Sequence, residues 1–329
     1  MFYFIEILRA IAVALITNSH FKGVYPNDIL SFGGGLGLAL FFMISGYLLA
    51  NIKDETKFTK WYFKKIVRLW VPLWIVRIIE FSIGFRTVDN FYDFFIQFVF
   101  PGAWFSGAIA VLYILFYMYV KYVINKKGKK STYCALLVLA ALYLVLFFVK
   151  SPLGMFNISE LRIEKTFSIE TPYLISQIIW FSCMLLGAHI RKNATTEDKS
   201  TKNTAIKFFL SIAFVGLFLA IKLLIEKPQF AMFECLLATS YIGFAYNIFN
   251  CFMGLEKICC KVLKNPFGKI VGIVSKCSLE IYYIQFLLIS KLKNIIFPVN
   301  FVALCVAIIV SAYFVHWLAD KITNFKKVK

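Results

Sequence analysis

Two ionisable side chains stand inside the first apolar segment of the chain, at a spacing that would place them on one helix face. Arg9 and His20 are eleven residues apart in the stretch FYFIEILRAIAVALITNSH. Eleven residues turn an α-helix by about three full turns and advance it by roughly 16 Å. Ionisable groups are costly in lipid unless they are paired or face a polar cavity, so this face indicates a polar reaction channel. Imidazole is also the side chain best suited to accept a hydroxyl proton at neutral pH.

Glu6 adds a carboxylate to the same segment. It lies one turn before Arg9 and is expected to pair with it. A simpler interpretation also fits, in which Glu6 and Arg9 pair near the inner membrane interface and His20 only caps the outer end of the helix. Spacing alone leaves both interpretations open.

The second apolar segment, FGGGLGLALFFMISGYLLA, begins with glycines and carries further small residues. Such residues let helix backbones approach closely. The candidates for helix packing here are Gly34, Gly37, Ser45 and Gly46. Helix packing is the ordinary role of such a segment, and the glycine spacing matches neither a P-loop nor a dinucleotide-binding fingerprint.

A basic cluster lies at the inner end of the third apolar segment. Lys64, Lys65 and Arg68 lie within about one helical turn of each other, and Pro72 follows. A cytoplasmic basic cluster attracts phosphates, either of lipid head groups or of a phosphorylated substrate. Ordinary positive flanking of a membrane helix gives the same pattern.

The elements that must position these residues are membrane helices. Of the 329 residues, 60% are hydrophobic, and the mean hydropathy is +0.77. This composition predicts an all-α polytopic membrane protein, a single domain over residues 1–329 with no separate soluble domain. About ten spans are expected, near residues 3–20, 30–50, 62–82, 102–124, 132–149, 171–190, 206–225, 229–252, 270–290 and 297–319.

The distribution of positive charge sets the predicted orientation. With both termini in the cytoplasm, every inner connection is richer in Lys and Arg than every outer connection. The formal net charge of +19 is then a membrane-topology signal, and no solvated basic face with exposed aromatics indicates nucleic-acid binding. The expected partners are membrane lipid and the substrates, and no oligomeric state is predicted. The eight cysteines lie mostly in apolar segments, and no Cys/His spacing indicates a metal site.

Three pieces in this order resemble the acyltransferase family 3 membrane proteins. The family's Arg-x10-His first helix is matched by LRAIAVALITNSH, and its glycine-rich second helix by FFMISGYL with the preceding glycines. Its basic stretch before a proline is matched by Lys65, Arg68 and Pro72. Two later stretches resemble the family less closely. CSLEIYYIQF keeps Ser278 and Tyr282 but has Gln285 where many members have His, and GAWFSGAIAVLYILF keeps Trp104.

The resemblance implies acyl transfer, usually of acetyl from cytoplasmic acetyl-CoA, to a carbohydrate hydroxyl on the extracytoplasmic side. The acceptor would be a surface polysaccharide or its lipid-linked precursor, and the location a bacterial cytoplasmic membrane. The basic cluster would then dock the phosphates of acyl-CoA. His20 would act as general base or as acyl carrier, and Arg9 would polarise the thioester or orient the pantetheine arm.

Two other functions remain as alternatives. A transporter or flippase of a carbohydrate or lipid-linked intermediate would also carry intramembrane charges. Neither an inverted repeat nor paired broken helices indicate it. The second alternative is a structural subunit of a polysaccharide export complex, which would tolerate substitution of both Arg9 and His20. Binding of acyl-CoA would favour the enzyme over the transporter.

Overall fold

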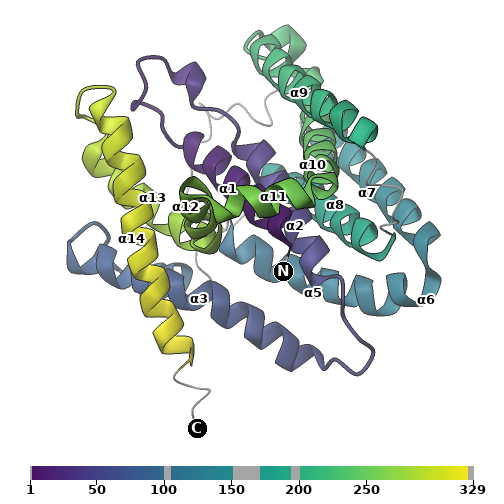
Figure 1. Cartoon of the computed structure of the whole chain (residues 1–329), viewed down its shortest axis with the longest axis horizontal. Coiled ribbons are helices and arrows are strands. Elements are labelled where there is room, and N and C mark those ends of the chain that lie inside the picture. The colour runs from purple at the N-terminus through teal and green to yellow at the C-terminus, as the bar shows by residue number, and fades with distance from the viewer. Residues whose placement is uncertain (1, 100–104, 151–170, 194–200, 325–329) are drawn as a thin grey trace. The chain divides into compact units, whose positions relative to one another are not determined.

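Every element of the described chain is helical. The computed structural model describes residues 2–99, 105–150, 171–193 and 201–324. Figure 1 labels the helices. By their contacts they divide into two compact units. The first comprises Met1–Gly37, Asp54–Ile114 and Glu256–Lys329, and the second comprises Leu38–Lys53 and Leu115–Leu255.

The first unit joins the N-terminal helix to helices from the C-terminal part of the chain. Helix α1 packs against α11, α12 and α13, while α14 packs along α13 and α3. The bounds are α1 Tyr3–Asn18, η1 Asp28–Leu30, α3 Phe58–Ser82, α4 Phe91–Phe94, η2 Phe95–Val99, α11 Glu256–Lys264, α12 Pro266–Lys276, α13 Ser278–Leu292 and α14 Val299–Asn324. The unit also holds the first residues of α2 (Gly34–Leu49) and α5 (Ser106–Tyr119).

Apolar side chains from four helices form the core of this unit. Val13 of α1, Val76 of α3, Ile281 of α13 and Ile308 of α14 are among its buried members. The start of α1 is fixed by Glu256, whose carboxylate oxygens accept from the backbone N–H groups of Tyr3 and Phe4 at 3.0 and 2.8 Å. A carboxylate is stabilising there because the first N–H groups of a helix lack partners within it. Residues far apart in the sequence therefore hold α1 in place.

The predicted span at residues 270–290 is not one straight helix. It consists of α12 and α13, which meet at Cys277 with a bend of 81°. Polar residues surround the break, with Lys276 before it and Glu280 in the first turn of α13. Apolar content over the whole segment conceals such a break, because hydropathy averages over residues whose backbone direction changes.

The second unit is also a helical bundle. Its helices α9 and α10 pack side by side, as do α7 and α8. The bounds are η3 Val120–Ile124, α6 Asn125–Lys127, α7 Lys129–Lys150, α8 Thr171–Asn193, α9 Thr201–Leu224, η5 Pro228–Leu236 and α10 Leu237–Gly254, with the rest of α2 and α5.

Helices α2 and α8 cross in very close contact within this unit. A Cβ added at Gly46 would lie 2.0 Å from the backbone oxygen of Met184, and one added at Gly187 would lie 2.0 Å from that of Met43. Only glycine permits backbones to approach so closely. Near the end of the same two helices, the Arg191 guanidinium donates to the Tyr47 hydroxyl at 3.1 Å.

Several helices are long and apolar enough to cross a bilayer. Among the described residues there are six such helices, or seven when the bent pair α12–α13 counts as one span. They correspond to seven of the ten predicted segments, and α1, α3 and α8 stay predictions as spans. Helix α1 has 16 residues, which is about 24 Å and short for a bilayer core.

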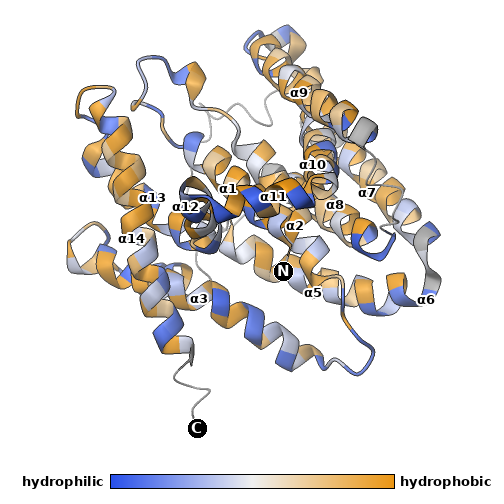
Figure 2. Ribbon diagram, in the orientation of Figure 1, coloured by the Kyte–Doolittle hydropathy of each residue, from blue (hydrophilic) through white to orange (hydrophobic). Residues whose placement is uncertain are grey.

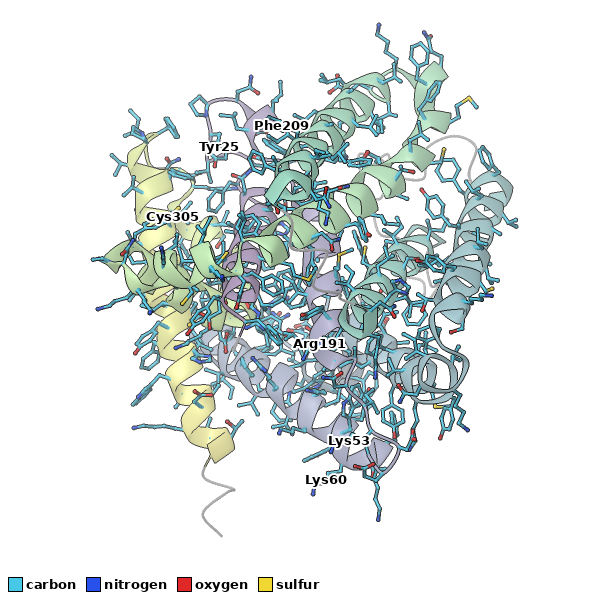
Figure 3. The ribbon with its side chains drawn as sticks, turned by 45° about the vertical axis from the view of Figure 1, so that its right-hand side comes forward. Tyr25, Lys53, Lys60, Arg191, Phe209 and Cys305 are labelled. Carbon is cyan, nitrogen blue, oxygen red and sulfur yellow. The ribbon has the colours of Figure 1, made fainter. Side chains whose placement is uncertain are left out.

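Apolar surface remains exposed on these helices, as expected for contact with lipid. Figure 2 shows α9 and α14 as mainly hydrophobic along their length. Phe209 of α9, labelled in Figure 3, is among the exposed residues. It is 68% exposed, and Val310 of α14 is 62% exposed. Continuous apolar faces of this kind are rare on soluble monomers and indicate a multi-pass membrane protein.

Candidate active site

The first helix ends two residues earlier than the sequence predicts. Regular α-helix stops at Asn18, and a turn follows in which the N–H of His20 donates to the oxygen of Thr17 at 3.0 Å. Arg9 therefore lies within the helix, whereas His20 lies just beyond it. Ser19 still has helical backbone angles, and His20 lies in the turn that follows, so a shared face for Arg9 and His20 stays a prediction.

Asn18 fixes the turn that carries His20. Its side-chain nitrogen donates to the backbone oxygens of Leu30 and Phe32 at 2.7 and 3.0 Å, and its oxygen accepts from the Tyr25 hydroxyl at 2.6 Å. Burial, together with the nearby Cys305 thiol, raises the pKa of Tyr25, so the hydroxyl remains a proton donor. These bonds tie the loop after α1 to the helix end.

The glycines at the start of α2 lie against the same end of α1. A Cβ added at Gly37 would lie 2.6 Å from the backbone oxygen of Ala12, and one added at Gly34 would lie 2.5 Å from Ser19 Oγ. Any larger residue would push α2 away from the last turns of α1. The glycine-rich segment thus sets the surroundings of His20 within the first unit.

His20 is half-buried and contacts an aromatic ring. Its imidazole packs edge-on against Phe286 of α13, with ring centroids 4.7 Å apart. Phe286 in turn contacts Tyr282, which contacts Phe105 with centroids 4.5 Å apart. Within the described chain, no hydrogen bond is made by the ring nitrogens of His20. The imidazole is therefore held by packing against Phe286.

Arg9, toward the other end of α1, lies among charged groups. Glu6, Arg68 of α3 and Tyr113 of α5 are close enough to act on its guanidinium electrostatically. The direct ion pair expected between Glu6 and Arg9 is not formed, since no contact within 4.0 Å joins them. Glu6 instead faces Gly272 of α12. Arg9 thus keeps its hydrogen-bond donors free of a carboxylate.

Arg68 links the basic cluster to Arg9. Its charge acts on Arg9, on Lys65 and on His316 of α14, which places it centrally among the cations of this unit. The Lys65 ammonium lies 6.0 Å from the centre of the Trp61 ring. Lys64 and Arg68 are exposed. A concentration of positive charge with exposed members is suited to binding phosphate groups.

Near Arg68 lies a second group of ionisable side chains, Glu280, His316 and Asp320, which the sequence pattern alone did not reveal. His316 Nδ1 lies 2.8 Å from Glu280 Oε1, and His316 Nε2 lies 3.6 Å from Asp320 Oδ2. Glu280 is 4% exposed, and its other carboxylate oxygen is buried without a partner. The sequence signals were a glutamate inside an apolar segment and the His316–Asp320 spacing of one helical turn. No linear pattern joins residues 36 positions apart.

The remaining candidates on α13 are buried polar residues. Gln285 has no exposed surface, and both its amide oxygen and nitrogen lack partners among the described residues. Ser278 is buried at the start of the helix. The Tyr283 hydroxyl lies 3.0 Å from Ser106 Oγ of α5. Helix α13 therefore contributes to the His20 contact, to the Glu280–His316 pair and to the packing of α5.

Three predicted residues are not placed beside these groups. Trp104 lies outside the described residues, and Ser45 and Gly46 belong to the second unit. No group of three or more His, Cys, Asp or Glu with the arrangement of a metal site occurs in the part of the chain that the structure describes.

The sequence matches one known protein family over nearly its whole length. A family model described as an acyltransferase domain matches residues 2–319, which is nearly the whole chain. Comparisons with curated proteins and with solved structures give no match. The match includes α1 with Arg9 and His20, the basic cluster of α3 and the Glu280–His316 pair.

Proposed function

Because the chain belongs to acyltransferase family 3, an acyltransferase group acting on hydroxyls, we propose that it transfers acetyl from cytoplasmic acetyl-CoA to a carbohydrate hydroxyl. The acceptor is a surface polysaccharide or its lipid-linked precursor on the extracytoplasmic side of a bacterial cytoplasmic membrane. One observation carries the proposal beyond the family. Toward one end of helix α1, Arg9 lies near the basic cluster. Just beyond the other end of the helix lies His20, whose ring nitrogens have no hydrogen-bond partner among the described residues.

The basic end of α1 is suited to the acyl donor. Acetyl-CoA carries several phosphate charges, and Arg68, Lys65 and Lys64 together supply the positive charge to bind them. These residues lie in the predicted inner connection, so the donor would approach from the cytoplasm. Arg9, which is less exposed than Arg68, would then orient the pantetheine arm or polarise the thioester carbonyl.

The His20 end is suited to the acceptor. A hydroxyl oxygen attacks the thioester carbonyl carbon while its proton passes to the imidazole of His20. The carbon–sulfur bond breaks, and the imidazolium returns the proton to the departing thiolate. In the alternative sequence, His20 attacks the thioester first and then passes the acyl group to the hydroxyl. Both sequences yield one ester and one free thiol.

The test is acyl transfer by the purified protein. The full chain, reconstituted in lipid with acetyl-CoA and isolated polysaccharide, should form O-acetyl esters that NMR detects, and should release free thiol in equal amount. Stabilisation of the detergent-solubilised protein by CoA is the companion measurement, because a ligand that binds only the folded state raises the unfolding temperature. A protein that moves carbohydrate across vesicles but forms no ester would refute the proposal.

A further inference from the structure

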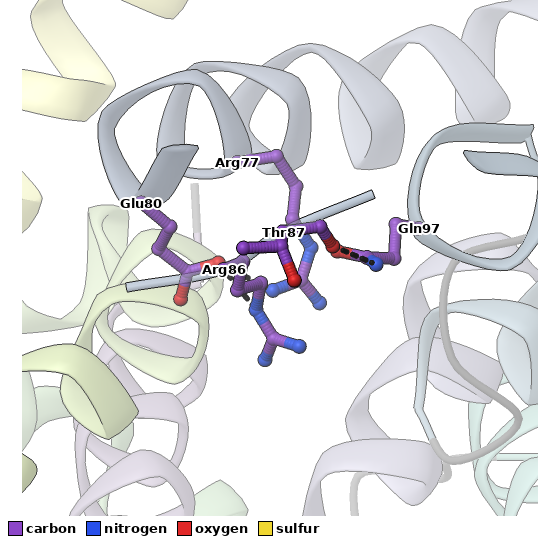
Figure 4. Close-up of polar contacts among 5 residues, drawn as sticks. All are labelled: Arg77, Glu80, Arg86, Thr87 and Gln97. Carbon is purple, nitrogen blue, oxygen red and sulfur yellow. Dashed lines mark hydrogen bonds and ion pairs between the residues drawn. The ribbon is translucent and has the colours of Figure 1, made fainter. Parts of the chain in front are cut away.

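A buried carboxylate at the end of α3 opposite the basic cluster is shared by two guanidiniums. Glu80 Oε2 accepts a hydrogen bond from Arg77 Nη1 and another, of 2.8 Å, from Arg86 Nε (Figure 4). Arg77 belongs to α3, whereas Arg86 comes from the loop that follows it. Because both donors bind the same oxygen atom, the two guanidiniums lie next to each other.

The charges at this place do not balance. The side chain of Glu80 is 1% exposed, that of Arg77 is 16% exposed and that of Arg86 is 36% exposed. Two guanidiniums face one carboxylate, which leaves one positive charge unbalanced at a place where Arg77 is largely buried and Arg86 is partly exposed. A buried charge is costly unless it is paired, so this arrangement favours an additional anion.

Most of the hydrogen-bond donors are also unused. Each guanidinium carries several N–H donors in a planar fork, and Glu80 accepts only one bond from each arginine. Arg77 Nε is buried and has no partner in the described part of the chain. Bulk water cannot reach a nitrogen without exposed surface, so its donor requires either an enclosed water molecule or a ligand.

The loop that carries Arg86 is held firmly. The N–H of Phe85 donates to the backbone oxygen of Glu80 at 2.8 Å, and Gly84 takes the positive φ of 67° that the turn requires. On the other side of Arg86, the Gln97 side chain donates to the backbone oxygen of Thr87 at 3.1 Å (Figure 4). The backbone that carries Arg86 is thereby held before any ligand arrives, which lowers the entropic cost of binding.

We propose that Arg77 and Arg86 form a binding site for an oxyanion, namely a phosphate or carboxylate group. Planar guanidiniums recognise such groups through paired N–H···O bonds, and Glu80 orients both forks. The loop after α3 lies on the predicted outer side, so the oxyanion would belong to the carbohydrate acceptor. That last assignment rests on the proposed function, whereas oxyanion binding itself does not.

The binding test uses the full chain in detergent without acyl-CoA. Inorganic phosphate, added at constant ionic strength against chloride, should raise the unfolding temperature of the wild-type protein. Arg86→Gln should weaken the apparent affinity for phosphate about tenfold, since one charge-assisted donor set is lost. Lys22→Gln is the control for charge, because it removes one positive charge from an exposed position in a different predicted outer loop, and it should respond as the wild type does.

Glu80→Gln provides a test in the opposite direction. It removes the competing carboxylate with little change of shape, so phosphate should bind more tightly than to the wild type. A purely structural ion pair would instead make both variants less stable and leave the phosphate response unchanged. Equal responses to phosphate in the wild type and Arg86→Gln, or an equal response to chloride, would overturn the site.

Two further measurements identify the source of the oxyanion. In nanodiscs of phosphatidylcholine the phosphate response should persist. The same measurement is then made in nanodiscs that contain phosphatidylglycerol. If the wild type no longer responds to added phosphate there, the site binds a lipid head group; if the response persists, the site binds a group carried by the acceptor. In the second case Arg86→Gln should raise the KM for an acidic acceptor and leave the KM for acetyl-CoA unchanged. Because binding is measured without transfer, a failure of the acyltransferase assay would not affect it.

Discussion

His316 Nδ1 of α14 lies 2.8 Å from Glu280 Oε1 of α13, and this contact joins two helices of the first unit through a nearly buried carboxylate. The Glu280 side chain sits in the first turn after the bend at Cys277, so the contact also fixes where α13 begins relative to α14. Asp320 lies on the other side of the imidazole, 3.6 Å from Nε2. Arg68 is near enough to act on the same ring.

Breaking this pair from one side should destabilise the protein strongly. His316→Ala leaves Glu280 buried with neither oxygen paired, a change that costs about 3–5 kcal/mol in comparable buried pairs. The double variant Glu280→Leu/His316→Leu should recover much of the loss, because no buried charge remains. Unfolding temperatures in detergent measure both effects, and a double variant no more stable than His316→Ala would contradict this account.

His20→Ala should abolish acyl transfer without loss of folded protein. General-base catalysis is worth about 10²–10⁴-fold, so kcat should fall by at least that factor while the unfolding temperature stays near that of the wild type. His189→Ala, the same substitution in α8 of the second unit, should keep its activity. Transfer at the wild-type rate by His20→Ala would remove the catalytic role of this residue.

Phe286 should act as a positioning residue for His20. Its ring is the packing partner of the imidazole, at 4.7 Å between centroids. Phe286→Ala should lower kcat by about tenfold, because small misplacements of a reacting group are costly, and should leave the KM for acetyl-CoA unchanged. Phe286→Tyr keeps the ring and should restore most of the rate. A rise in KM with unchanged kcat would contradict a positioning role.

Loss of the basic cluster should affect donor binding more than turnover. The triple variant Lys64→Ala/Lys65→Ala/Arg68→Ala should raise the KM for acetyl-CoA more than it lowers kcat. Among the single changes, Arg68→Ala should have the largest effect, because Arg68 also acts on Arg9. Added salt should raise the KM of the wild type and change that of the triple variant less, since screening weakens the same attraction. An unchanged KM in the triple variant would exclude docking at this cluster.

Gly37→Ala should disturb the contact between α2 and α1. The added methyl group would meet the backbone oxygen of Ala12 at 2.6 Å, which cannot move aside as a flexible side chain can. Overpacking of this kind costs about 1–3 kcal/mol, so the unfolding temperature should fall. Gly216→Ala in α9 is the matched control, because nothing lies within 4 Å of the added carbon. That variant should be neutral or slightly stabilised through better helix propensity.

The sequence by itself determined where the helices lie and which of them carry charge. Apolar runs and loop charges depend on local composition, so the ten predicted segments correspond closely to described helices, and the glycines of α2 and the basic residues of α3 could be identified directly. The end of α1 was missed by two residues, because Asn18 at the turn bonds to Leu30 and Phe32, which no helical period relates to it. The bend at Cys277 was missed because the segment is apolar on average, although Lys276 and Glu280 interrupt it.

The tertiary structure alone decided which charged and aromatic groups meet. Phe286 became the partner of His20, Arg68 became the neighbour of Arg9, and Glu280 paired with His316 rather than with a residue of its own helix. Each of these contacts joins segments far apart in the chain. Helix periodicity fixes only the face on which a side chain stands, whereas packing between helices fixes what it touches.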